Sequence, residues 1–181
     1  GDELAKMLGD KRPKVDGGSR EIVVTPKTRA YKFYQRQLEK RVKASKAWKP
    51  SKDEPNNPDP IIAIIGDGRL AAIDMRFVNP AAANDPDSKL NKLADRVVEV
   101  FRETADRVYL NKDGSPQPHK GSAMMVFSDI GFGEGVTEER GFNARAWFEK
   151  RLRDAGVPIG QVAWMQDHKK SVDKAKLFAD V

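Results

Sequence analysis

The spacing of apolar and polar positions predicts helices through most of the first 110 residues. Over Thr28–Ala47, apolar side chains recur every three or four residues, and lysines and arginines crowd the opposite face. Further helices are expected over Asp67–Phe77 and Asp85–Asp106, with Asp85 able to cap the first turn of the second. Prolines, asparagines and aspartates make residues 49–60 a predicted loop.

The second half alternates short apolar runs with helical periodicity. Residues 123–127 are continuously apolar and end in Ser128 and a glycine-rich loop, a pattern typical of a strand buried on both faces. A second short strand is predicted over 161–165, and helices over 143–155 and 171–181. Strand–helix–strand–helix order indicates a parallel sheet. The expected fold class is α/β, with a partial parallel sheet beside an N-terminal, mainly helical part.

These patterns divide the chain into three parts. Residues 1–20 are polar and contain glycines, so we expect an extended segment. Residues 21–110 form the mainly helical part, which opens with a short predicted strand at Glu21–Thr25. Residues 122–181 form the predicted α/β unit.

Composition narrows the classes of function. The net charge of +6 and the pI near 9.5 suit a polyanionic partner. The absence of cysteine excludes disulfides and thiolate metal sites, and the two histidines show no metal-ligand spacing, so we expect no metal site. There is no apolar run of about 18 residues and no signal-peptide pattern, so we expect a cytoplasmic protein without a membrane partner.

The glycine loop supports one interpretation as a methyl-donor site. Asp129, Gly131, Gly133 and Gly135 fit the pattern D-x-G-x-G-x-G, which resembles the first motif of S-adenosylmethionine-dependent methyltransferases. Glycines would let the backbone approach the ligand, and Asp167 would hold the ribose hydroxyls. However, Asp167 follows Gly135 by 32 residues, where dinucleotide folds have about 20. Because the glycine pattern fits and this spacing does not, a methyltransferase fragment is kept only as an alternative.

The chain contains a longer series of short segments in this order: residues 12–14, 21–25, 31–35, 70–80, 88–93, 124–128, 161–167 and 174–178. This series resembles the start of the second RecA-like domain in Swi/Snf-type superfamily II helicases and translocases. Met124-Met-Val-Phe-Ser128 matches the family's motif IV. Within the family, the chain is similar to large phage, plasmid and bacterial helicases that often carry an N6-adenine methylase domain, some of them DarB-like antirestriction proteins.

The resemblance implies an incomplete RecA-like α/β unit over 122–181 and a fragment of an ATP-dependent DNA helicase or translocase. Its partners would be DNA, the missing first RecA-like lobe and the rest of the second lobe. ATP and Mg²⁺ would be cofactors of the complete protein. This chain has no G-x-x-x-x-G-K-[ST] loop, so we expect no catalytic residues and no ATP binding or hydrolysis by the chain alone.

The resemblance also implies where DNA would bind, because residues that follow the strands in such domains contact phosphates. Two other interpretations stay open: the Ser128 hydroxyl could satisfy a turn, and residues 168–170 could be a solvated helix cap. A basic DNA-binding module without chemistry is the third hypothesis for the whole chain. The candidate nucleic-acid-binding residues are Ser128, Gly131, Gly133, His168, Lys169 and Lys170.

Overall fold

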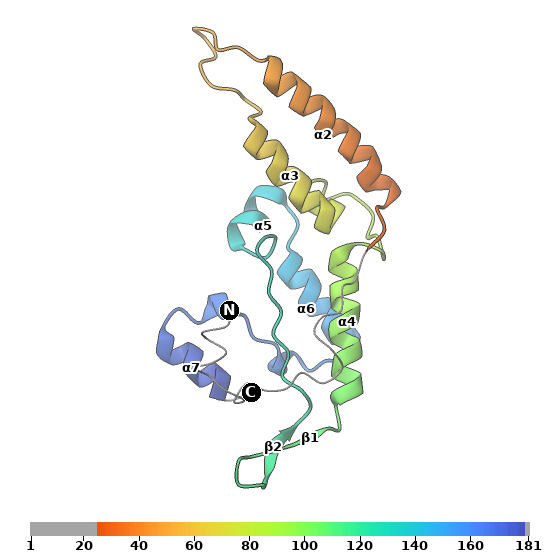
Figure 1. Ribbon diagram of the computed structural model, residues 1–181, viewed down its shortest axis with the longest axis vertical. Helices are drawn as coiled ribbons and strands as arrows, with labels where there is room; N and C mark the ends of the chain where they lie inside the picture. Colours follow the sequence, from red (N-terminus) through yellow and green to blue (C-terminus); the bar gives the residue numbers. More distant parts are fainter. Residues whose placement is uncertain (1–24, 180–181) are drawn as a thin grey trace, which may run out of the picture.

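The computed structural model describes residues 25–179, and this part of the chain is mostly helical (Figure 1). The predicted extended segment 1–20 and residues 21–24 of the first predicted strand lie outside the described residues. The helices are α2 (Arg29–Ala47), α3 (Ile61–Ile73), α4 (Lys89–Thr104), α5 (Glu134–Arg140), α6 (Ala144–Asp154) and α7 (Ser171–Ala179). Within the same residues, three short 3₁₀ helices accompany them: η2 (Met75–Phe77), η3 (Ile159–Gln161) and η4 (Met165–Asp167).

Helices α2 and α3 lie side by side and extend away from the other helices (Figure 1). Thr28 caps α2, because its hydroxyl accepts a hydrogen bond from the backbone N–H of Tyr31 at 3.2 Å. Leu38 is the buried residue of α2, and it reaches α3 at Gly68. A β-carbon at Gly68 would lie 3.2 Å from Leu38 Cδ1, so this glycine lets the two helices approach closely.

The hydrophobic core lies where α4, α6 and the end of α3 meet. In α4 the buried apolar residues Leu90, Ala94 and Val98 follow one another at intervals of four, as one face of a helix requires. Phe77 of η2 is fully buried and closes the core from the side of α3. The other buried members of this core are Leu70, Ala144, Phe148, Leu152 and Val157.

The predicted parallel sheet is wrong. Within residues 25–179 the sheet structure consists of two antiparallel strands, β1 (Val108–Leu110) and β2 (Pro116–Lys120). Residues 123–127 are irregular, and the side chain of Phe127 is 86% exposed. The second predicted strand is irregular over residues 162–164, and its end residues Gln161 and Met165 belong to η3 and η4. An apolar run indicates a buried strand only if neighbouring strands pair with it, and none does so in the described part.

The α/β fold class, and with it the RecA-like sheet over 122–181, is therefore corrected to a mostly helical fold with one small hairpin. Helix α3 begins at Ile61, not at Asp67, and ends before η2. Helix α4 is capped by Ser88, whose hydroxyl accepts from Asn91 N–H at 3.2 Å, and not by Asp85. The helices predicted over 28–47 and 143–155 are confirmed, with Thr28 and Asn143 as their caps.

Candidate nucleic-acid interface

Gly131, the buried glycine of the predicted binding loop, serves packing. Its φ of +100° lies in the left-handed region that favours glycine. A β-carbon at this position would lie 2.8 Å from Cζ of Phe77, closer than such atoms pack. The neighbours Ile130 and Phe132 also pack against the hydrophobic core. Core packing therefore accounts for glycine at this position without any ligand.

The other candidate residues of the loop do not come together to form a binding site. Ser128 is exposed, and its hydroxyl donates to the carbonyl oxygen of Ile130 at 2.8 Å, which satisfies a local turn. Gly133 precedes α5 as its N-cap residue, and Gly135 lies within α5. Both glycines have open space where a β-carbon would lie. Asp129 is exposed to solvent.

Asp167, the residue predicted to hold the ribose of the methyl donor, forms an ion pair within the protein. Both carboxylate oxygens of Asp167 accept hydrogen bonds from the guanidinium of Arg145, one of them at 2.8 Å. These hydrogen bonds hold the pKa of Asp167 below its ordinary value. The loop and this segment do meet, through the rings of Phe132 and Trp164, whose centroids lie 5.5 Å apart. They meet as packed aromatic side chains, so this geometry offers no support for a donor pocket.

The remaining predicted DNA-binding residues lie between η4 and α7. His168 ends η4 and is half-buried, whereas Lys169 and Lys170 are exposed. Their exposure is compatible both with DNA contact and with a solvated cap before Ser171. Their role stays a prediction.

The largest accumulation of positive charge lies elsewhere, on α2 and its flanks. Residues 27–49 contain nine lysines and arginines and one acid, Glu39, which gives a local charge of +8. The rest of the chain, residues 1–26 and 50–181, carries a formal charge of −2. The basicity of the protein is therefore a property of this one segment.

Five of these cations form a continuous row on the solvent-facing side of α2, which we call the basic stripe. Their spacing of three or four residues places them on one face of the helix, opposite the buried Leu38. In the described part of the chain, none of the five forms an ion pair, so their charge is available to a partner. The basic stripe consists of Arg29, Lys32, Arg36, Lys40 and Lys43, all exposed.

Arg41 is the exception among the α2 cations, because it turns toward α3 and fixes the helix. Its guanidinium donates to both carboxylate oxygens of Asp59, at 2.8 and 2.7 Å, and to Asp67 at 2.8 Å. The hydrogen bonds to Asp59 are the largest cause of a raised pKa at Arg41, and they lower the pKa of Asp59. This anchoring holds the opposite face of α2, which bears the basic stripe, toward solvent.

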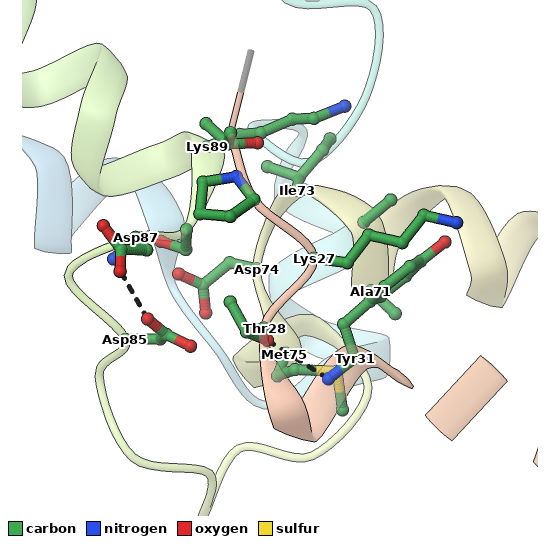
Figure 2. A pocket seen from close by; sticks show the side chains of 14 residues that line it. Lys27, Thr28, Tyr31, Ala71, Ile73, Asp74, Met75, Asp85, Asp87 and Lys89 are labelled. Atoms are coloured by element: carbon green, nitrogen blue, oxygen red, sulfur yellow. Dashed lines mark hydrogen bonds between the residues drawn. The ribbon is translucent and has the colours of Figure 1, made fainter. Parts of the chain in front are cut away.

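An open cleft of about 180 Å³ lies at the start of α2, between this helix, η2 and the start of α4 (Figure 2). Its lining contains Lys27 and Lys89 together with the acidic residues Asp74, Asp85 and Asp87. Mixed charges of this kind do not select an anion such as a nucleotide phosphate. We therefore do not assign a ligand to the cleft.

Sequence patterns identified the basic face of α2 but assigned DNA binding to loops, because the predicted sheet placed those loops at strand ends.

Among the described residues, no group of acidic and histidine side chains comes together that could hold a metal ion. No helix in the same part of the chain is long and apolar enough to span a membrane. Comparison with family models, with curated proteins and with solved structures finds no match.

Proposed function

We propose that this chain is a part of an ATP-dependent DNA helicase or translocase of the cytoplasm and contributes a DNA-contacting surface. The order of the segments that resemble the Swi/Snf-type family supports the motor assignment. The observation that carries DNA contact is the concentration of positive charge in the basic stripe. ATP and Mg²⁺ act in the complete protein, together with the remaining motor regions that hold the nucleotide.

The basic stripe has dimensions that suit a nucleic-acid backbone. From Arg29 to Lys43 the α-helical rise gives a length of about 21 Å. One strand of a duplex places about six phosphates along that length. Five free cations on one rigid helix would neutralise several of them, and such contacts position the backbone without reading its sequence.

A basic DNA-binding module without chemistry is the second candidate, since it would use the same surface. The two are separated by ATP hydrolysis, because the chain alone lacks a phosphate-binding loop and is expected to hydrolyse no ATP. A motor part restores DNA-stimulated hydrolysis when it is combined with the regions that hold the nucleotide. A simple binding module leaves hydrolysis unchanged in the same assay.

The geometry of the loop does not favour the methyltransferase alternative. The ring of Phe77 fills the space beside the α-carbon of Gly131, and Asp167 is paired with Arg145. We expect no saturable binding of S-adenosylmethionine in a calorimetric titration. Micromolar binding of that cofactor would restore the methyl-donor interpretation.

The test of DNA contact is fluorescence anisotropy of labelled DNA across a salt series. If about five phosphates are neutralised, log–log plots of affinity against salt should have slopes of about −3 to −5. The variant Arg36→Gln/Lys40→Gln/Lys43→Gln removes three cations of the basic stripe and should flatten the slope by about 2 to 3. Its matched control neutralises three exposed lysines elsewhere, as Lys112→Gln/Lys169→Gln/Lys170→Gln.

The two triple variants also compare the two locations of the DNA site. A loss confined to the α2 variant supports the basic stripe. A loss confined to the control variant contradicts it and returns the contact to the segment that follows η4. Absence of binding by the unaltered protein at low salt contradicts the proposal as a whole.

A further inference from the structure

Phe33 is an exposed aromatic side chain in the middle of the basic stripe. Its side chain is 63% exposed, although burial of a phenylalanine ring is strongly favourable. On the helix it follows Arg29 by four residues and precedes Arg36 by three, so all three share one face. In residues 25–179, no other ring stacks on it and no guanidinium covers it.

The two tyrosines beside Phe33 have different surroundings. Tyr31 is half-buried and lines the cleft at the start of α2 (Figure 2). Tyr34 is half-buried on the α3 side, where its hydroxyl accepts a hydrogen bond from Arg41 at 3.4 Å. Both rings therefore have packing or hydrogen-bonding partners within the fold. Phe33, in contrast, is exposed to solvent between the unpaired cations of the basic stripe.

We infer that the basic stripe binds single-stranded DNA, with Phe33 as a platform on which a base stacks. The inference rests on the proposed function and adds the form of DNA that the surface prefers. In a duplex the faces of the bases are covered by their neighbours, so a ring on the protein surface meets only phosphates and sugars. In a single strand the base faces are free, and aromatic side chains between cations are the usual platform.

The anchoring of α2 fixes the direction in which Phe33 points. Leu38 packs against α3 on one side of the helix, and Arg41 joins Asp59 and Asp67 there. These contacts prevent α2 from rolling, so Phe33 stays on the solvent side. A base that stacks on Phe33 would keep its own phosphates within reach of Arg29 and Arg36, its neighbours on the same face.

The experiment measures the affinity of Phe33→Ala for oligothymidine and for a duplex of equal length by fluorescence anisotropy. Loss of one stacking contact should weaken single-strand binding about tenfold. Duplex affinity should change less than twofold, and the salt slope should stay the same because no charge is removed. Phe33→Trp, which enlarges the ring, should keep or raise single-strand affinity.

The matched control is Phe127→Ala, because Phe127 is an even more exposed phenylalanine outside the basic stripe and beside the predicted contact Ser128. It should leave both affinities unchanged, and circular dichroism should show that all variants keep the helical content. If Phe33→Ala leaves single-strand affinity unchanged, or weakens binding of both forms of DNA equally, the inference is wrong but the proposed function stands. No binding of either form by the unaltered protein overturns the proposed function and the inference with it.

Discussion

Arg41 of α2 donates a hydrogen bond to the carboxylate of Asp67 in α3 across 2.8 Å. The other oxygen of the same carboxylate pairs with Arg140 of α5 at 2.6 Å. The side chain of Asp67 is only 12% exposed, whereas those of its two arginine partners are each 31% exposed. One nearly buried carboxylate thus joins three helices and, together with Asp59 and Leu38, fixes which face of α2 is turned to solvent.

The substitution Asp67→Asn should destabilise the protein because it leaves two guanidinium groups without their shared partner. We expect a loss of about 1–3 kcal/mol in the free energy of unfolding, measured by urea denaturation. Asp59→Asn serves as the control, because Asp59 also pairs with Arg41 but is more exposed, so its loss should be smaller. If the two losses are equal, Asp67 does not join the helices in the way described.

Arg76 and Asp74 form the most buried ion pair in the described part of the chain. The guanidinium donates from Nε and Nη2 to the two carboxylate oxygens, both at 2.8 Å. Its carbon lies over the rings of Phe142 and Trp147, 4.5 and 4.6 Å from their centroids. The substitution Arg76→Met would leave the carboxylate buried and unpaired. We expect a cost of about 3–5 kcal/mol, from thermal or urea unfolding. A cost similar to that of a surface ion pair, below about 1 kcal/mol, would contradict this role.

The same pair predicts a dependence of stability on pH. Burial acts to raise the pKa of Asp74, but the hydrogen bonds from Arg76 and Ser88, together with the charge of Arg76, outweigh it and hold the pKa below its ordinary value. Such a group contributes stability above its unfolded pKa, near 4, and the contribution is lost as the pH falls through the folded value. The difference in unfolding free energy between the protein and Asp74→Asn should therefore narrow below about pH 4. A difference that does not change with pH would contradict the assignment.

Gly131 should tolerate no larger side chain. The substitution Gly131→Ala places a β-carbon 2.8 Å from Cζ of Phe77, at a φ of +100°. Overpacking and backbone strain together should cost about 2–4 kcal/mol of unfolding free energy. Gly135→Ala is the control, since it lies in α5 with open space around it and should be neutral or slightly stabilising. Equal stability of the two variants would show that Phe77 does not pack closely against Gly131.

The sequence predicted the helices well where periodicity and caps agree. Thr28 and Asn143 stand directly before amphipathic segments, and both are N-caps in the structure. The α/β prediction failed at residues 123–127, because an apolar run does not reveal whether a partner strand lies beside it. Similarly, the pattern D-x-G-x-G-x-G could not show that Gly131 serves the packing of Phe77. Local signals located α2, α4 and α6, but they placed the start of α3 at Asp67 instead of Ile61 and missed α5 (Glu134–Arg140). They could not show tertiary pairing.

The basic face of α2 was visible in the sequence, but its importance was not. Charge counts over the whole chain give +6 and conceal that residues 27–49 alone carry +8. The inward turn of Arg41 depends on Asp59 and Asp67, which lie 18 and 26 residues further along the chain. The exposure of Phe33 likewise follows from how α3 packs, which helical spacing alone does not specify.

The most direct test of DNA contact through α2 is a lysine-acetylation footprint with and without bound DNA, read by mass spectrometry. The account predicts that DNA protects Lys32, Lys40 and Lys43 in the basic stripe and leaves Lys112, in the turn of the β1–β2 hairpin, as reactive as before. Protection of Lys169 and Lys170, with the α2 lysines unchanged, would contradict it.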